Sequence, residues 1–206
     1  MRCFIAIDID EATRSRIKEL AEQLQQEAQL RKSDVKWVAP ENIHLTLKFL
    51  GEVRDSDIAE VCRIVADTAG DHERFAVEAA NVGSFGRPPR VVWVGINDSG
   101  RLARLQKDLD ERLADAGRPT DRKQFHGHLT LCRVKNTHAG KVLGNVLRHQ
   151  EPVGVGTIFV DSLCVYSSDL TPAGAVYTLV SRSSMSMINE PIDSREMMYG
   201  QDEEED

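Results

Sequence analysis

The chain has 206 residues, of which 41% are hydrophobic, and a formal net charge of −7. These values are typical of an ordinary globular protein with one domain or two small lobes and a sizeable core. The charge is uneven, because residues 190–206 hold eight acids and one arginine and leave residues 1–189 neutral overall. The acidity therefore does not exclude a polyanionic substrate for residues 1–189.

The cysteines and apolar runs limit the compartment and the chemistry. The four cysteines lie far apart without a C-x-x-C pair, which argues against a zinc cluster and a redox motif; they are Cys3, Cys62, Cys132 and Cys164. Reduced thiols in a cytosolic protein are expected for a chain with its own core. The first apolar run is too short for a signal peptide, and no later run could span a bilayer. We expect a cytoplasmic protein without a membrane segment.

Two series of elements follow from the apolar patterns and the helix caps. In the first half they are a strand over 2–7, a helix capped by Asp10, a strand ending at Gly51, a helix opening at Asp55 or Ser56 and closing at Gly70, and a strand over 75–82. In the second half they are a strand over 91–96, a helix opening at Ser99 or Gly100, a strand carrying His128, a helical segment over 142–147, and strands over 157–165 and 175–181.

The two series form an internal repeat. The apolar positions 17, 20, 24 and 28 of the first helix recur at 102, 105, 109 and 113, an offset of 85 residues. We therefore predict an α+β fold in which units of about 2–83 and 91–182 form two lobes. Two antiparallel sheets would face a central cleft with the helices outside. Residues 1–183 would form this single bilobal domain, and residues 184–206 an acidic, disordered tail.

The tetrapeptide His-Leu-Thr-Leu occurs twice, at residues 44–47 and 128–131. Side chains of a strand alternate between its faces, so in each copy the histidine and threonine share one face and the leucines the other. The leucines would anchor each strand in the core. We interpret the copies as two halves of one active site, with His44 and Thr46 in one half and His128 and Thr130 in the other.

Two histidines across a cleft suit a displacement in which one imidazole activates the nucleophile and the other protonates the leaving oxygen. Both threonines could donate hydrogen bonds to the non-bridging oxygens of a phosphate. Lys48 would share the face of Thr46 and help to hold an anion. Arg133 would need a bulge or the end of its strand to turn toward the site. Phe85, Arg87, Arg90 and His126 are expected nearby, the arginines for phosphate and the aromatic ring for a base.

At this point the sequence resembles the two-histidine phosphoesterase superfamily, and most of all its RNA 2′,3′-cyclic phosphodiesterases, also called 2′-5′ RNA ligase-like proteins. The resemblance covers residues 2–182. Its matching pieces are residues 2–7 (RCFIAI), 44–51 (HLTLKFLG), 83–85 with 90–95 (GSF and RVVWVG), 125–133 (FHGHLTLCR), 163–170, Gly174 and Tyr177. One departure is Gly127, where the family usually has proline; the glycine is expected to loosen the entry of the strand that positions His128.

The resemblance implies hydrolysis of a 2′,3′-cyclic phosphate at an RNA end to a 2′-phosphate, without metal, cofactor or ATP. His44 would be the proton donor and His128 the proton acceptor, although the near-symmetric motifs give no local reason for this direction. Arg133, Phe85, Arg90, Lys48 and His126 would bind the substrate, an RNA or nucleotide. The reverse reaction would join such an end to a 5′ hydroxyl through a 2′-5′ bond. We expect a monomer.

Two rival interpretations stay open. A metal-dependent phosphodiesterase could use His126 and His128, which lie two residues apart and so on one strand face. Neither motif contains a carboxylate to complete such a ligand set. The other rival is a nucleotide- or RNA-binding module that uses the same cleft without catalysis.

Overall fold

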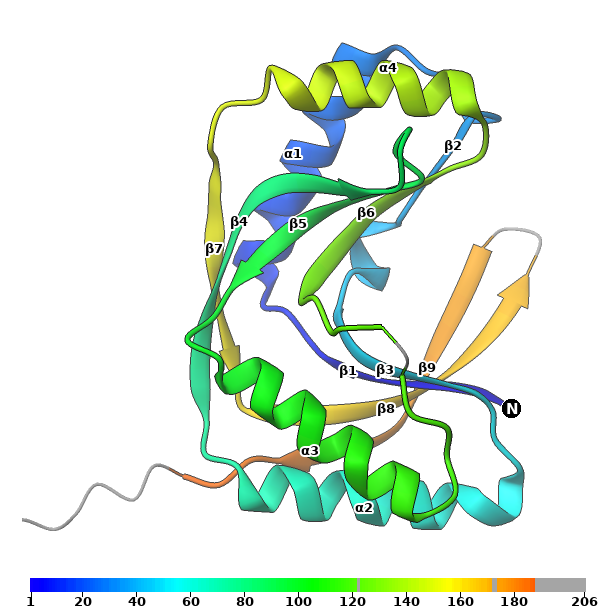
Figure 1. The fold of residues 1–206 in the computed structure, drawn as a ribbon, viewed down its shortest axis with the longest axis vertical. Helices are drawn as coiled ribbons and strands as arrows, with labels where there is room; N and C mark the ends of the chain where they lie inside the picture. The colour runs from blue at the N-terminus through cyan, green and yellow to red at the C-terminus, as the bar shows by residue number, and fades with distance from the viewer. Residues whose placement is uncertain (122, 172–173, 188–206) are drawn as a thin grey trace, which may run out of the picture.

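The computed structural model describes residues 1–121, 123–171 and 174–187, and all the strands in these ranges belong to one antiparallel sheet (Figure 1). The strand order is β7-β4-β5-β6-β3-β1-β8-β9, with β2 beside β6. The strands are β1 Arg2–Ile7, β2 Val35–Trp37, β3 Leu45–Glu52, β4 Phe75–Phe85, β5 Val91–Asn97, β6 His128–Val134, β7 Gly154–Val160, β8 Ser162–Thr171 and β9 Gly174–Ser184.

The α+β class is confirmed, but the expectation of two separate sheets is wrong. Strands β7, β4, β5, β6 and β2 form one half of the sheet, the β6 arm, and β3, β1, β8 and β9 form the other, the β3 arm. The arms join where Leu45 of β3 pairs with Leu129 of β6. One such pair between two strands is enough to make the curled sheet continuous, and no apolar pattern within either strand could indicate it.

Four α-helices in the described ranges cover the arms, and they are α1 Glu11–Ala28, α2 Ile58–Asp71, α3 Arg101–Asp115 and α4 Thr137–Arg148. Helices α1 and α4 pack on the β6 arm, and α2 and α3 pack on the β3 arm (Figure 1). The chain therefore alternates between the arms, because β1 lies in the β3 arm whereas the next helix, α1, covers the β6 arm. Each arm contains elements from both halves of the sequence.

The predicted helix faces are buried as expected. Ile17 and Leu24 of α1 and Leu105 and Leu109 of α3 have no exposed surface. The Asp10 carboxylate accepts a hydrogen bond from the backbone N–H of Thr13, at 2.8 Å, and so caps α1. The third helix starts where the sequence predicted, with Gly100 as its N-cap residue.

That start is set by a carboxylate from outside the helix. The Asp98 carboxylate accepts hydrogen bonds from the backbone N–H groups of Arg101 and Leu102. These bonds satisfy two of the N–H groups that have no partner within the helix. Arg101 is therefore the first helical residue, directly after the N-cap residue Gly100.

The predicted strand over 157–165 is two strands, because β7 ends at Val160 and β8 begins at Ser162. Strand β7 pairs with β4 in the β6 arm, and β8 pairs with β1 in the β3 arm. The chain thus crosses between the arms at Asp161. An apolar run cannot reveal such a crossing, since both parts need the same kind of residue.

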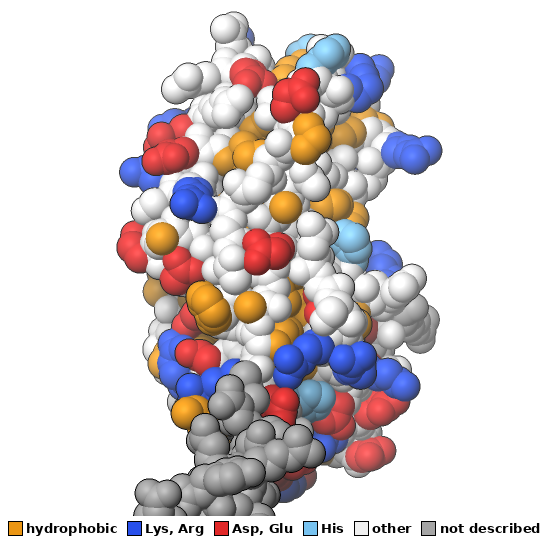
Figure 2. All heavy atoms as spheres, turned by 90° about the vertical axis from the view of Figure 1, so that its left-hand side faces the viewer, with side chains coloured by type: hydrophobic (Ala, Val, Ile, Leu, Met, Phe, Trp, Pro, Cys, Tyr) orange, Lys and Arg blue, Asp and Glu red, His pale blue; other side chains and the backbone are white. Residues whose placement is uncertain are grey.

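The surface away from the β8–β9 hairpin carries side chains of both charges with separate apolar side chains among them (Figure 2). Single exposed apolar residues of this kind are normal on a protein surface. No helix in the described ranges is long and apolar enough to cross a membrane.

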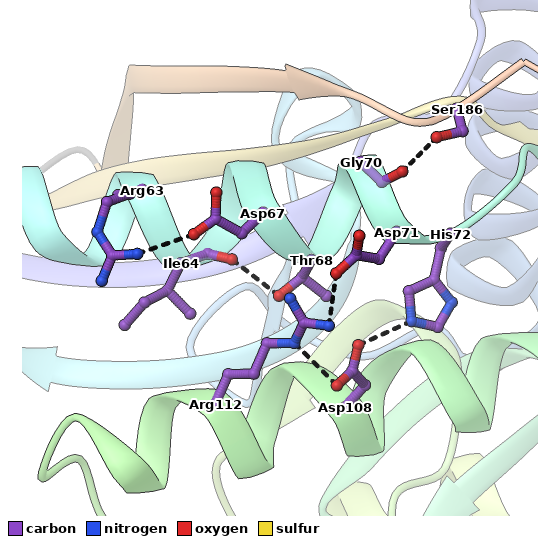
Figure 3. A network of polar contacts seen from close by, with 10 residues as sticks. All are labelled: Arg63, Ile64, Asp67, Thr68, Gly70, Asp71, His72, Asp108, Arg112 and Ser186. Carbon is purple, nitrogen blue, oxygen red and sulfur yellow. Dashed lines mark hydrogen bonds and ion pairs between the residues drawn. The ribbon is translucent and has the colours of Figure 1, made fainter.

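The folded chain continues past residue 183, where the sequence predicted the tail to begin. Met185 is only 3% exposed, the Ser186 N–H donates to the carbonyl of His72, and the Ser186 carbonyl accepts from the N–H of Arg74. Beside this segment, His72 and Arg112 join α2 to α3 through Asp108 and Asp71 (Figure 3). The rest of the predicted tail, residues 188–206, lies outside the described residues.

Candidate active site

Both His-x-Thr motifs present the arrangement expected of alternating strands. His44 immediately precedes β3, and His128 opens β6. The four leucines of the motifs are at most 2% exposed; they are Leu45, Leu47, Leu129 and Leu131. Because Leu45 pairs with Leu129, the flanking positions bring His44 beside Thr130 and Thr46 beside His128, on the opposite face of the sheet. The two motifs therefore meet at the junction of the two arms.

Each catalytic candidate is held by the same backbone contact. Nδ1 of His44 lies 2.8 Å from the carbonyl oxygen of Asn42, and Nδ1 of His128 lies 2.8 Å from that of His126. A carbonyl oxygen only accepts, so Nδ1 carries the proton in both rings. In the neutral form Nε2 is therefore the free acceptor, and both rings offer the same nitrogen for proton transfer.

The two histidines differ in their surroundings. Burial lowers the pKa of His44 to about 4, and burial also lowers the pKa of His128. The Asp8 carboxylate acts in the opposite direction on His44 and favours its protonated form. Arg133 and His126 instead add to the lowering at His128. Arg14 and the His128 ring oppose protonation of His44, and burial is the largest cause of the lowered pKa at both rings.

Aromatic rings fix the first imidazole in the β3 arm. Phe4 of β1 stacks on the His44 ring with centroids 4.7 Å apart, and Tyr177 of β9 meets it edge-on at 5.3 Å. Phe4 is almost completely buried between these rings and Tyr166. The sequence indicated Phe4 and Tyr177 only as parts of family motifs, because their contact with His44 depends on which strands pair.

A bulge in β3 overturns the prediction for Lys48. Ile5 pairs with Lys48 and Ala6 with Thr46, so Leu47 is the extra residue and the alternation shifts by one. Lys48 consequently points away from the face of Thr46, where its ammonium group pairs with Asp110 of α3 and donates to the Pro119 carbonyl at 2.9 Å. It is 3% exposed and does not reach the site.

A matching bulge in β6 has the opposite consequence for the prediction. Val92 pairs with Cys132 and Trp93 with Thr130, which makes Leu131 the extra residue. Arg133 is thereby turned to the face of Thr130, as the sequence analysis required if it were to reach the site. It is exposed there, and its charge acts on both His128 and Tyr177.

Phe85 and His126 lie beside the second imidazole. The Phe85 ring is 5.0 Å from that of His128 and 5.7 Å from that of His126, edge-on to both. Trp93 contacts the same two histidines, at 6.3 and 5.0 Å. A side chain at Gly83 would collide with this indole, since its Cβ would fall 2.2 Å from the ring. The glycine in GSF therefore makes room for Trp93.

Arg87 and Arg90 lie farther along the β6 arm. Val91 pairs with Arg133, so Arg90 stands at the end of β6 that is remote from His128. Both arginines line a pocket of about 120 Å³ together with Lys135. Strand β4 ends at Phe85, and after the turn the N–H of Arg90 donates to the Phe85 carbonyl at 2.7 Å. The expectation that the two arginines adjoin the histidines stays a prediction.

Gly127 does not leave the entry of β6 loose. A Cβ at this position would lie 2.9 Å from Cδ2 of Leu102 and 3.3 Å from Cβ of Ile96. The Gly127 carbonyl also accepts a hydrogen bond from the N–H of Ile96. The glycine is closely packed between α3 and β5 just before His128.

Arg14 of α1 is a further residue that the sequence did not single out. Its guanidinium donates to the carbonyl oxygens of Pro40, at 2.6 Å, and Ile9, at 3.2 Å. It thereby holds the short turn whose Asn42 carbonyl binds His44. Beside it a pocket of about 210 Å³ reaches from Asp8 to His44.

No group of three or more His, Cys, Asp or Glu side chains suited to a metal ion occurs within residues 1–121, 123–171 and 174–187. In the same ranges, neither Thr46 nor Thr130 uses its hydroxyl in a hydrogen bond to another protein group. The site thus offers two imidazole Nε2 atoms, two hydroxyl groups and the Arg133 guanidinium on one face.

The model of the family described as LigT like Phosphoesterase matches residues 7–93 and residues 94–177. The chain is 33% identical over 180 residues to the RNA 2′,3′-cyclic phosphodiesterase of Methanothermobacter thermautotrophicus, covering 86% of this chain and 95% of that protein. It is 34% identical over 179 residues to the protein of the same name from Archaeoglobus fulgidus, covering 86% and 96%. The solved structure of TT0787 from Thermus thermophilus resembles it with a TM-score of 0.74 and 26% identity, over 90% of this chain and 98% of that one.

Proposed function

The chain belongs to the LigT-like phosphoesterase family, and on that premise we propose that it hydrolyses 2′,3′-cyclic phosphate ends of RNA to 2′-phosphates without metal or ATP. The observation that carries the proposal is the meeting of His44 and His128, each with Nδ1 fixed by a backbone carbonyl and Nε2 free. The names of the relatives support the substrate class.

In the proposed reaction a water molecule attacks phosphorus and forms a new P–O bond while the bond to the 3′ oxygen breaks. Nε2 of His128 accepts the proton of the water, and Nε2 of protonated His44 donates a proton to the departing 3′ oxygen. The product has a 2′-phosphate and a 3′ hydroxyl. The assignment of roles follows the family resemblance. Asp8 favours the charged form of His44 and Arg14 opposes it, while Arg133 favours the neutral form of His128.

The anionic substrate itself helps to protonate His44. Burial depresses its pKa because the imidazolium loses hydration, and a phosphate in contact with the ring would offset that loss. Thr46 and Thr130 would donate to the non-bridging oxygens as negative charge accumulates there. Arg133 would bind the same oxygens, and Phe85 with His126 would contact the terminal base. Run in reverse, the same site would join a cyclic phosphate end to a 5′ hydroxyl through a 2′-5′ bond.

We further propose a single domain over residues 1–183 with an extension that is anchored through Ser186. The strand order supports a duplicated origin. Exchanging β7 with β9, β4 with β8, β5 with β1 and β6 with β3 gives the same order read from the other edge of the sheet. A monomer suffices, since one chain supplies both motifs. Cytoplasm is the proposed compartment, and all four cysteines are free thiols in agreement with it.

The test is hydrolysis of a short RNA ending in a 2′,3′-cyclic phosphate, in EDTA, with identification of the phosphate isomer. We expect a 2′-phosphate from the wild type, and its formation should be about 10²–10⁴ times slower in His44→Ala or His128→Ala. His72→Ala, which changes a histidine that binds Asp108 far from the motifs, is the matched control. A folded wild type without turnover would favour the binding module, and activity lost only in EDTA would favour the metal-dependent enzyme.

A further inference from the structure

Two basic side chains lie directly opposite each other on the face that carries the site. Lys36 of β2 pairs in register with Arg133 of β6, and both are exposed. Like charges at such a position repel each other and destabilise the sheet. No ion pair in the described part of the chain involves either residue. An anion bound between them would remove this repulsion.

Three more basic residues continue the row beyond the end of β6. Arg87, Arg90 and Lys135 line the pocket of about 120 Å³, and all three are exposed. The acid nearest to Lys135 along the pairing is Asp34, whose carboxylate already accepts a hydrogen bond from Asn136 at 2.8 Å. Among the described residues, none of these three basic groups forms an ion pair.

Basic residues elsewhere differ from this row. Several basic residues on the outer helices are paired with acids, as Arg63 is with Asp67, Lys107 with Glu111 and Arg112 with Asp71. The side shown in Figure 2 likewise has acidic and basic side chains interspersed over most of its area. The pocket at the end of β6 differs, because its lining residues include three basic side chains and no acid.

The row starts at the catalytic face and leads away from it. From His128 to Val134 the strand advances six residues, one of them the bulged Leu131, which is at most about 20 Å at the usual rise per residue, and Lys135 follows directly. Arg133 lies between them and already faces Thr130. An extended single strand of RNA that enters at the histidines would follow β6 with its phosphates over these cations. Basic grooves that track a nucleic-acid backbone in this way bind several nucleotides without reading their sequence.

We propose that Lys36, Arg133, Lys135, Arg90 and Arg87 form a binding path for the RNA backbone upstream of the cyclic phosphate. The natural substrate is then the end of an oligonucleotide rather than a free nucleoside cyclic phosphate. The inference rests on the proposed function for the identity of the ligand. The cations themselves select a polyanion of extended shape.

The test compares binding and turnover in one set of variants. Binding is measured by fluorescence anisotropy with a labelled RNA hexanucleotide that ends in a 2′-phosphate and cannot react. Turnover is measured on a nucleoside 2′,3′-cyclic phosphate and on a hexanucleotide with the same end. The path variant is Lys36→Ala/Lys135→Ala, and the matched control is Arg104→Ala/Lys107→Ala, which removes the same charge from the exposed side of α3.

We expect the path variant to weaken hexanucleotide binding about tenfold, and to reduce the slope of log K against log salt by about 1.4, because two phosphate contacts are lost. Its kcat/KM should fall more on the hexanucleotide than on the nucleoside cyclic phosphate, and the control should bind like the wild type. Equal losses in path and control variants would overturn the path, as would equal kcat/KM of the wild type on both substrates.

The two proposals fail in distinguishable ways. If both cyclic substrates are hydrolysed but binding ignores Lys36 and Lys135, the path is wrong and the proposed function stands. If neither is hydrolysed while binding still depends on these lysines and on salt, the path stands and the proposed function is wrong.

Discussion

The two halves of the site begin from one tetrapeptide and end in different environments. Each histidine gives its Nδ1 proton to the carbonyl two residues earlier, and each strand bulges at the second leucine. Beyond the bulge the β3 arm turns Lys48 inward and exposes Phe49, whereas the β6 arm turns Cys132 inward and exposes Arg133. The shared backbone provides two equivalent proton-transfer positions. The residues after the bulges make one side apolar and the other basic.

The largest expected effect comes from removing either imidazole, because only one of the two equivalent proton-transfer positions then remains. His44→Ala and His128→Ala should each lower kcat by about 10²–10⁴, the usual contribution of general acid–base catalysis. Because both act in one transition state, the double variant should be little slower than the slower single variant. Rapid-quench kinetics, which follow the loss of the cyclic phosphate end over time, measure the rate for each variant. Multiplicative losses would show that the histidines serve separate sites.

The residue after each bulge tests the difference between the halves. Arg133→Ala should reduce kcat/KM about 10- to 100-fold, since a hydrogen bond from a charged donor contributes about 1.5–3 kcal/mol. Phe49→Ala, at the equivalent place in the β3 arm, should change kcat/KM by less than about threefold, because that side chain is 64% exposed and carries no charge. Steady-state kinetics on the same cyclic substrate compares them. Equal losses would mean that both arms bind the phosphate alike.

Lys48 provides the corresponding stability test. Removing its charge leaves Asp110 with a side chain only 15% exposed and without its partner, so Lys48→Met should destabilise the protein by about 3 kcal/mol. The double variant Lys48→Met/Asp110→Leu should regain most of this, since a buried pair is often replaceable by apolar residues. Urea unfolding gives both values. If the folded Lys48→Met protein instead loses substrate affinity, the lysine acts in the cleft.

The outcome for Lys48 shows what the sequence could and could not predict. The repeated motif, the strand alternation within it and the buried helix positions such as Ile17 and Leu105 were readable because each depends on residues close in the chain. The bulge is different, since one extra residue leaves no mark in a pattern of period two. It reversed the placement of Lys48 and supplied the turn that Arg133 needed.

Other features depended on partners that are distant in the sequence. The single pair of Leu45 and Leu129 turns two expected sheets into one. Phe4 and Tyr177 reach His44 only because β1 lies between β3 and β8, with β9 beyond them. Met185 reads as one apolar residue among polar neighbours, yet it is buried because the following Ser186 bonds to the end of α2. Local patterns give no information on such contacts.

The pH profile measures the environments of the two histidines together. The reaction needs one protonated and one neutral imidazole, and burial lowers the pKa of both, that of His44 to about 4. In the free enzyme kcat/KM should therefore be bell-shaped with its maximum between pH 4 and about 6.5, and it should fall as rising pH removes the remaining proton. The profile alone does not assign acid and base, since the two groups titrate as a pair. A plateau extending above pH 7 would contradict this prediction.

The smallest expected effect separates the halves by moving one limb of that profile. Asp8 favours the charged form of His44, so Asp8→Asn should lower the pKa of His44 and move the acid limb to lower pH, by less than about one unit. The amide keeps an oxygen that accepts from the Tyr166 hydroxyl, which lies 2.8 Å from the carboxylate, so the fold should persist.

Arg133→Ala should instead move the alkaline limb of the pH profile upward, because Arg133 contributes to the lowered pKa of His128. Asp34→Asn in the β6 arm is the control. If Asp8→Asn and Arg133→Ala both shift the same limb of the pH profile, the prediction is wrong. The two imidazoles would then share one electrostatic environment, and the arms would differ in structure only.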